Sequence, residues 1–239
     1  MPTTNPTTGF GNGLQFTYTA ASHLYTISGD GISLSFGPAD YFSQGAAGDA
    51  WIKGDDLLTL EPLTWGGTRM VYNRVSYINA KKTGIPIAYA CVTGVPTLAF
   101  DVPATGTINF SKAGMDAFAD TSISGTVTDY SLGKAGVSFG ADFTAKTVTI
   151  GLHLVATTTA PGPHTDVDLG MVTGSGVIDR TTGHFSGSWS GTGQEAIGDF
   201  AGSFFGPQAQ EFALAYSFRG RDGSGVPILV SAGAVNGSR

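Results

Sequence analysis

Charged residues and cysteine are the scarce components of this sequence. Asp, Glu, Lys and Arg make up 13% of its 239 residues, against about 25% in an average globular domain. Long helices on a protein surface need many charged side chains, so this composition disfavours them. The single cysteine, Cys91, excludes a disulfide bond within the chain and any metal or redox site built on a Cys-x-x-Cys pair.

Basic clusters and long apolar runs are also missing. The formal net charge is −6 and no run of Lys and Arg occurs, so the sequence predicts no nucleic-acid partner. No stretch of about 18 apolar residues occurs, and no transmembrane segment is expected. Residues 1–6 lack the basic and apolar regions of a signal peptide. Either the protein is cytoplasmic or the sequence starts after a removed signal, and the glycine-rich, weakly charged composition favours the second interpretation.

Glycine and alternating apolar residues are abundant. The chain contains 36 glycines and 41% hydrophobic residues, which suits twisted β-sheets joined by tight turns. In the first hundred residues, apolar and polar positions alternate as they do in strands. The turns Ser28–Gly31 and Lys81–Gly84 separate two pairs of these segments and predict hairpins. The strands expected in this part are residues 14–19, 23–27, 32–36, 69–78 and 85–92.

A passage containing Pro96 and Pro103 marks a boundary. Beyond it, short strands recur at hairpin spacing, and eight or nine of them favour closure into a barrel because closure removes exposed edges. Only two short stretches, 113–119 and 207–210, suggest single helical turns, so the prediction is an all-β protein. The barrel strands are expected near residues 105–112, 122–130, 135–143, 146–156, 168–178, 184–190, 197–205, 210–218 and 226–235.

The segment Gly202–Glu211 reads GSFFGPQAQE and resembles the penultimate hairpin of the transferrin-binding protein B-like β-barrel family. That family usually continues with Glu-x-Gly-Gly, whereas Ala213 and Leu214 fill the two small positions here. The packing of the last hairpin is therefore expected to differ. Three further segments agree with the family in order and spacing: a part of its N-terminal handle (36–40), the entry into its first barrel strand (94–97 with 103–107) and a barrel strand end (141–143).

The resemblance implies an all-β fold, with an N-terminal β-sheet handle domain over residues 1–100 followed by an eight-stranded antiparallel β-barrel over residues 101–239. It also implies a stand-alone, hemophilin-like bacterial protein that is secreted or anchored as a surface lipoprotein in the outer leaflet of the outer membrane. Such proteins leave the cell through an outer-membrane translocon. They capture haem or an iron-carrying protein and hand it to a TonB-dependent receptor.

The family motif also has an interpretation from its residues alone. Phe204 and Phe205 point to opposite faces of a strand, so one of them enters the core. Pro207 ends that strand because proline cannot donate to a β-ladder. Glu211 restarts the chain and is expected to accept hydrogen bonds from the turn amides. On this interpretation the motif shapes the barrel and does not contact a ligand.

Haem is the small ligand that the resemblance suggests, and haem iron is held by His, Tyr, Cys or Met within an apolar wall. His23 is expected on a strand face with Tyr25, and His164 in the long loop 160–166. With Tyr18 and Tyr41, which are near His23 in sequence, they form the candidate ligand set. The alternative is that both are ordinary surface or packing histidines. The other two histidines, His153 and His184, are expected to face solvent.

No catalytic pattern accompanies these candidates. The sequence has no Gly-x-Ser-x-Gly elbow, and its glycine-rich stretches lack the Gly-Lys-Ser/Thr of a P-loop. Asp55–Asp56 and the pair Asp166 and Asp168 have the carboxylates for a hard cation, but solvated turns are the favoured interpretation. We therefore predict a non-enzymatic binding protein. The alternative function is an adhesin or surface-structural protein that binds another protein or a polymer and needs no small ligand.

Overall fold

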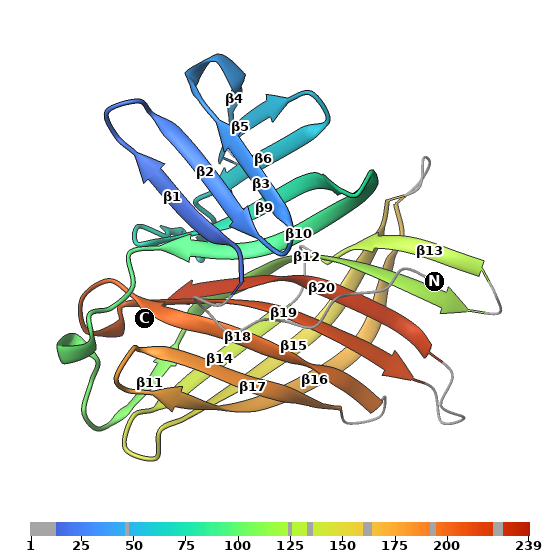
Figure 1. The fold of residues 1–239 in the computed structure, drawn as a ribbon. Helices are drawn as coiled ribbons and strands as arrows, with labels where there is room; N and C mark the ends of the chain where they lie inside the picture. Colours follow the sequence, from blue (N-terminus) through green and yellow to red (C-terminus); the bar gives the residue numbers. More distant parts are fainter. Residues whose placement is uncertain are drawn as a thin grey trace.

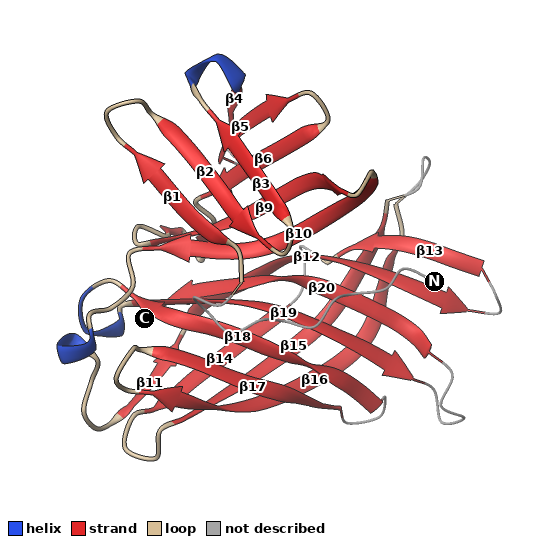
Figure 2. Ribbon diagram, in the orientation of Figure 1, coloured by secondary structure: helices blue, strands red, loops and turns tan. Residues whose placement is uncertain are grey.

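The computed structural model describes residues 13–45, 48–123, 126–132, 136–159, 164–191, 195–221 and 227–239. Strands dominate these residues, and the helical elements are three short 3-10 turns: η1 (Pro38–Asp40), η2 (Ala99–Asp101) and η3 (Pro207–Ala209). The all-β prediction is confirmed (Figure 2).

The first ten strands form the handle, which stands above the barrel in Figure 1. One handle sheet consists of β1 (Gln15–Thr19), β2 (Leu24–Gly29) and β3 (Ile32–Phe36). The other has the order β10 (Ile85–Gly94), β9 (Asn73–Lys82), β6 (Asp56–Glu61), β5 (Gly48–Lys53) and β4 (Tyr41–Gly45). A small hairpin, β7 (Thr64–Trp65) with β8 (Thr68–Arg69), connects β6 to β9.

The two handle sheets enclose a common core. Both predicted hairpins are present, with turns at Asp30–Gly31 and Thr83–Gly84. Strands β4, β5 and β6 were not predicted, because all three are short and the acidic residues of β5 and β6 weaken the apolar alternation of this stretch. Their apolar side chains nevertheless contribute to the core, whose buried members are Ile27, Ile32, Phe36, Trp51, Leu58, Ile78 and Ala80.

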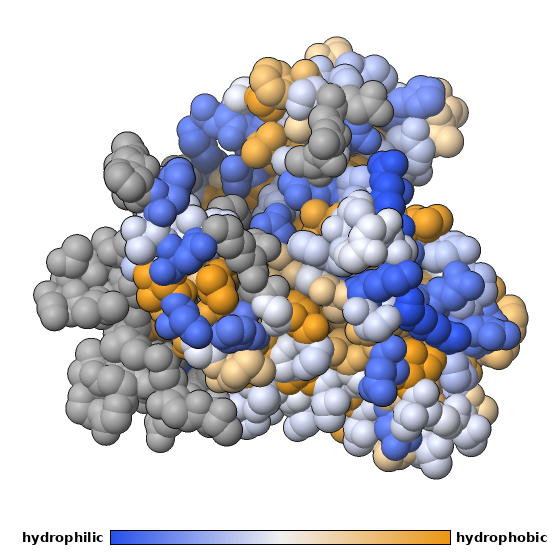
Figure 3. Space-filling view, turned by 180° about the vertical axis from the view of Figure 1, so that it is seen from behind, coloured by the Kyte–Doolittle hydropathy of each residue, from blue (hydrophilic) through white to orange (hydrophobic). Residues whose placement is uncertain are grey.

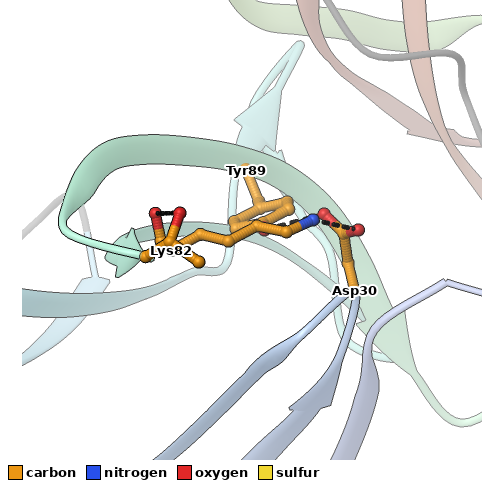
Figure 4. A network of polar contacts seen from close by, with 4 residues as sticks. Asp30, Lys82 and Tyr89 are labelled. Atoms are coloured by element: carbon orange, nitrogen blue, oxygen red, sulfur yellow. Dashed lines mark hydrogen bonds and ion pairs between the residues drawn. The ribbon is translucent and has the colours of Figure 1, made fainter.

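A polar contact joins the two handle sheets at the turn between β2 and β3 (Figure 4). Lys82 Nζ lies 2.6 Å from Asp30 Oδ1, and the Tyr89 hydroxyl donates to Asp30 Oδ2 at 2.9 Å. These two hydrogen bonds, from Lys82 first and then from Tyr89, hold the pKa of the Asp30 carboxyl below its usual value. Asp30 thereby fixes the three-stranded sheet to the β9–β10 hairpin.

The barrel contains β11 (Thr107–Phe110), β12 (Lys112–Ile123), β13 (Thr126–Ser131), β14 (Gly136–Asp142), β15 (Thr147–Thr158), β16 (Asp166–Asp179), β17 (His184–Gly191), β18 (Glu195–Phe205), β19 (Glu211–Arg221) and β20 (Pro227–Ser238). Antiparallel pairing runs from β15 through β16, β17, β18, β19, β20, β12 and β13 and returns to β15. This closed circuit has eight strands, as predicted, because β11 and β14 pair with each other as extensions of β12 and β13.

One expected helical turn is confirmed and the other is wrong. η3 occupies the predicted stretch 207–210. Residues 113–119, which are rich in alanine, belong instead to β12. There Met115 and Ala117 are buried in the barrel core while Asp116 is on the opposite face, so the alternation of a strand overrides the local composition. Part of the strand expected at 122–130 is likewise the end of β12, and β13 begins at Thr126.

Aromatic rings fill the barrel interior. Phe139 and Phe212 stack with their centroids 3.8 Å apart, and Phe204 contacts Phe185 at 5.1 Å. Leu214, the larger of the two residues that depart from the family pattern, is part of this core. Ala213 is fully buried on the other face of β19, and β9 and β10 of the handle pack against β19 and β20. A small side chain is needed there because two sheets meet.

The outer wall away from the handle has a different composition. About half of the exposed positions on β15, β16 and β17 are small hydroxyl residues, such as Thr149, Ser175 and Ser188, which are neighbours across the three strands. Figure 3, which views the molecule from behind, shows weakly polar side chains interspersed with small groups of apolar residues and with strongly hydrophilic ones. No helix of the described residues is long and apolar enough to cross a membrane.

Candidate functional site

The family motif forms the seam between handle and barrel. Both carboxylate oxygens of Glu211, which is 4% exposed, accept hydrogen bonds from the handle. The backbone N–H groups of Val71, Tyr72 and Asn73 donate at 2.7, 2.9 and 3.1 Å, and Asn73 Nδ2 donates at 2.7 Å. The prediction that Glu211 accepts from the turn amides is therefore wrong about the donors. The carboxylate does bind backbone amides, but they belong to Val71 and Tyr72 in the loop before β9 and to Asn73 at the start of β9.

The other motif residues reinforce this seam. Gly206 has a φ of 70°, and a Cβ at this position would overlap the ring of Tyr72. Its carbonyl accepts from Thr97 Oγ1 at 2.7 Å. Phe204 enters the barrel core, while Phe205 is buried on the outer face beside Gly94 of the handle. The side chains of the motif are thus engaged in contacts that hold handle and barrel together, in agreement with its structural interpretation.

The best candidate for a functional site is a group of side chains at one end of the handle, here called the aromatic patch: Tyr18, His23, Tyr25, Tyr41 and Trp51. Strand register creates it. Tyr18 on β1 is opposite Tyr25 on β2, and their rings lie 4.7 Å apart. Tyr41 on β4 is opposite Trp51 on β5, with centroids 5.5 Å apart.

Trp51 joins the two pairs into one patch. Its ring meets the edge of Tyr25 at 4.9 Å, so the contact bridges the two handle sheets. Trp51 is 8% exposed and belongs to the handle core, whereas Tyr18 and Tyr41 are 48% and 43% exposed. The patch therefore presents exposed rings on a rigid, buried base. Aromatic rings held in this way are typical of the residues that dominate binding energy at protein interfaces.

Asp49 is the acidic neighbour of the patch. The Tyr41 hydroxyl donates to Asp49 Oδ1 at 3.0 Å. Desolvation first, and then the hydrogen bond to Asp49, raises the pKa of Tyr41. Burial, followed by the neighbouring Tyr18 and Asp49, raises the pKa of Tyr25. Both phenols therefore stay protonated at neutral pH, and the Tyr41 hydroxyl uses its hydrogen in the bond to Asp49.

His23 reaches the patch by a route that differs from the prediction. It does not share a strand face with Tyr25, because it lies in the turn before β2 with a φ of 49°. A left-handed turn residue breaks the alternation that the prediction assumed. The exposed imidazole instead meets the neighbouring strand, with its Nδ1 2.9 Å from the Tyr18 hydroxyl.

His164 is not part of this group. It is exposed near the start of β16, where its Nδ1 lies 2.7 Å from the carbonyl oxygen of Thr158. Figure 1 shows this end of β15 and β16 on the barrel, far from the β1–β2 turn that carries His23. The structure thus brings together four of the five candidate residues, Tyr18, His23, Tyr25 and Tyr41. The preceding loop residues, 160–163, lie outside the described residues.

The remaining polar candidates have local partners. His153 is exposed, as predicted, and its Nε2 lies 3.1 Å from Asp168. His184 is half-buried, and this burial lowers its pKa, so the prediction of a solvent-facing side chain is only partly correct. Asp55 forms an exposed ion pair with Lys81. Among the described residues, no group of three or more His, Cys, Asp or Glu side chains is arranged to hold a metal ion.

Two members of the site were missed by sequence reasoning. Trp51 and Asp49 lie on β5, one of the strands that were not predicted. A tryptophan two residues after an acidic residue, in a short segment of alternating polarity, was the available signal. Only the pairing of β5 with β4 shows that both belong beside Tyr41.

Comparison with known proteins shows a similarity of fold. No family model matches the chain, and no curated protein matches it either. Two solved structures of transferrin-binding protein B from Haemophilus parasuis, one a single and one a double mutant, each superpose with a TM-score of 0.50 over 90% of this chain, at 15% and 16% identity. The corresponding protein of Neisseria meningitidis gives 0.48 over 90%, at 18% identity. The chain spans about two-fifths of these proteins, covering 41%, 40% and 39% of their lengths.

Proposed function

We propose that this chain, which has the fold of a transferrin-binding protein B-like handle and barrel, is a bacterial surface or secreted protein that captures an iron-carrying protein through the aromatic patch. The observation that carries the proposal is the exposure of Tyr18 and Tyr41 on the buried base of Trp51. Tyrosine and tryptophan anchors of this kind bind at low entropic cost because their rings are already held in place.

The fold supports binding over catalysis, although a fold alone does not define a function. The proteins that share it are named as transferrin-binding proteins, and capture of an iron-carrying protein is the role we transfer from them. In the proposed sequence of events, a translocon exports the chain to the outer leaflet or beyond. The captured cargo then passes to a TonB-dependent receptor. The boundary between handle and barrel near residue 100 is part of the same proposal.

Binding of immobilised transferrin and of haemoglobin by the purified chain tests this function. The double substitution Tyr18→Ala and Tyr41→Ala should weaken binding by about thirtyfold or more, the effect of losing a hot spot of about 2 kcal/mol. Ile85→Ala is the matched control, because Ile85 is 64% exposed on the handle but outside the patch. If the chain binds neither protein, or if Ile85→Ala weakens binding as much as the double substitution, the proposal is wrong.

Haem is a second candidate ligand, and the convergence of His23 with Tyr25 and Tyr41 favours it. Imidazole and phenolate are both axial ligands of haem iron, and aromatic rings supply an apolar wall. On addition of haemin, a Soret band should shift and sharpen, and His23→Ala should abolish this change. His164→Ala also belongs in the experiment, because that histidine lies apart from the patch and its loss should have no effect. An unchanged spectrum removes haem from the proposal.

An adhesin that recognises a protein or polymer without a small ligand is the remaining alternative. The binding experiments above distinguish it from the two iron-related functions, because an adhesin of this kind would bind neither iron-carrying proteins nor haemin. Loss of attachment to cells or to a surface polymer on the same Tyr18 and Tyr41 substitutions would then identify the patch as an adhesive surface.

A further inference from the structure

A second polar cluster lies in the seam between handle and barrel, at the end of β6. Its acidic members, here called the carboxyl pair, are Glu61 on β6 and Asp116 on β12. Glu61 is opposite Val75 in the ladder between β6 and β9, and Val75 is fully buried. Tyr77, two residues along β9, points to the same side of the sheet as Val75 and Glu61. Its hydroxyl donates to the Asp116 carbonyl oxygen at 2.7 Å, so this side of the sheet faces the barrel.

Asp116 enters the same space from the barrel. Its two neighbours in sequence are fully buried in the barrel core, so the Asp116 side chain points outward, to the handle. A Cβ at Gly114, the preceding position on that face, would overlap the ring of Trp65. The indole Nε1 of Trp65 donates to Asn236 Oδ1 on β20 at 2.6 Å. The strand β7, which follows Glu61 in sequence, is therefore docked on the barrel beside the carboxyl pair.

The two acidic sites of the seam differ in their compensation. The Glu211 carboxylate accepts four hydrogen bonds from N–H groups. Desolvation first, and then the charge of Asp116, raises the pKa of Glu61 to about 7, although a hydrogen bond with Thr59 opposes the shift. Burial raises the pKa of Asp116 as well, against hydrogen bonds from Tyr77 and a backbone N–H. Two carboxylates that face each other in a half-buried space repel when both are ionised.

The other charged and titratable groups of the surrounding strands do not offset this repulsion. Lys112, on the same face of β12 as Asp116, lies beside the β7–β8 turn. Arg69 on β8 acts on Arg74. Strand β19 contributes the phenol of Tyr216, and β20 places an alanine opposite Asp116. Among the described residues, the groups that shift the carboxyl pair include no cation, so the pair depends on a bound proton for charge compensation.

We propose that the carboxyl pair is a proton-dependent switch that keeps the β6–β7 end of the handle docked on the barrel and releases it when the proton is lost. The Glu211 network does not depend on this proton, so the handle stays attached there and the change is a local opening. The docked form binds the proton more tightly than the open form, in which Glu61 is solvated. Opening is therefore suppressed in mild acid and increases as the pH rises through neutrality. The switch is independent of the ligand that the aromatic patch binds.

Hydrogen exchange of the tryptophan indole N–H groups, followed by NMR of the isotopically labelled whole chain, tests the proposal. Trp65 reports on docking because its N–H is bonded to Asn236 of the barrel. Trp189 is the internal control, because its N–H donates to the Asp199 carbonyl within the barrel at 3.3 Å and has the same intrinsic exchange chemistry. The ratio of the Trp65 rate to the Trp189 rate should rise about tenfold between pH 6 and pH 8. This is the increase expected if the pKa of one carboxyl falls from about 7 to 4.5 on opening.

Three variants identify the groups responsible. Glu61→Gln imitates the protonated carboxyl, so the fold is retained and the ratio should not change with pH. Asp116→Asn removes the like charge and should reduce the rise. Asp56→Asn is the matched control, because Asp56 is at the opposite end of β6, and this variant should show the tenfold rise of the wild-type chain.

Three results would overturn the proposal. The first is a wild-type ratio that does not change between pH 6 and pH 8. The second is a rise in Glu61→Gln as large as in the wild-type chain. The third is loss of the rise in Asp56→Asn, which would make the effect a general response to handle charge. Faster exchange of both indoles alike leaves the ratio constant and therefore counts as the first result, because it indicates global unfolding.

Discussion

The carboxylate of Glu211 on the barrel lies 2.7 Å from Nδ2 of Asn73 on the handle, although 138 residues separate them in sequence. Asn73 is itself fully buried, and its Oδ1 accepts a hydrogen bond from Asn236 on β20 at 2.8 Å. Three strands from two parts of the molecule thus share one buried polar network. A network of this kind holds the handle in a fixed orientation only if every member keeps its partner.

Glu211→Gln tests how much this network stabilises the fold. The substitution removes the charge that four donors share and places an NH2 group against backbone N–H groups, so the free energy of unfolding should fall by about 2–4 kcal/mol. Urea denaturation followed by tryptophan fluorescence measures it. Asp55→Asn, at an exposed ion pair, should change stability by less than about 0.5 kcal/mol. A loss at Glu211 no larger than this control would contradict the role of the carboxylate.

Gly206→Ala tests the close contact with Tyr72. At Gly206 an added methyl group must both adopt a positive φ and overlap the tyrosine ring, whereas at Gly84, with a φ of 82°, no atom lies within 4 Å of the added Cβ. Gly84→Ala should therefore lower the free energy of unfolding by about 1 kcal/mol, the cost of the backbone conformation alone. Gly206→Ala should lower it by at least about 2 kcal/mol more. Equal losses of unfolding free energy in the two variants would show that Tyr72 moves aside at little cost and that the close contact does not matter for stability.

The seam should also respond to pH through Glu61. Burial, and then the neighbouring Asp116, raises the pKa of Glu61 from 4.5 to about 7. Because the folded-state value is above the unfolded one, the stabilisation is complete below about pH 4.5 and is lost as the pH rises through about 7. Asp116 shifts in the same direction, mainly through burial. Tyr77 on β9 connects the handle to β12 of the barrel, because its hydroxyl donates to the carbonyl oxygen of Asp116 at 2.7 Å.

Comparison with Glu61→Gln isolates this contribution. Between pH 5 and pH 8 the wild-type chain should lose about 1 kcal/mol of unfolding free energy relative to the variant, a value reduced for solvent screening because Glu61 is only about half-buried. Urea titrations of both proteins at pH 5, 6, 7 and 8 measure the difference. If the difference in unfolding free energy between the two proteins does not change with pH, or if the wild-type chain is the more stable one at pH 8, Glu61 does not have the raised pKa.

Cys91 reports on the opening of the handle sandwich. Cys91 is partly buried and packs against the handle core, and burial raises the pKa of its thiol to about 12, so the folded protein should react slowly with a thiol reagent. Asp30→Ala removes the contacts that join the sheets at the β2–β3 turn and should speed labelling several-fold. Asp56→Ala, on β6 away from that turn, serves as the control. Equal labelling rates in the wild-type chain and Asp30→Ala would show that Asp30 does not limit the opening.

Most of the strands, and the all-β class, could be read from the sequence because alternation is a local property. His153, for example, faces solvent beside the buried Ile150 and Leu152, as its place in the alternation predicted. The local pattern misled where composition or a turn interrupted it. The alanine-rich stretch 113–119 is a strand, and His23 lies in a left-handed turn.

The sequence by itself determined the alternation of most strands, where the glycine turns fall and that the Phe-Phe-Gly-Pro motif ends a barrel strand. Only the tertiary structure decided that Tyr25 meets Trp51 and that Glu211 binds the amides of residues 71–73. The reason is physical. A period of two specifies the face of a strand, whereas contacts between separate sheets depend on how distant strands pair and how the sheets pack, which no local pattern encodes.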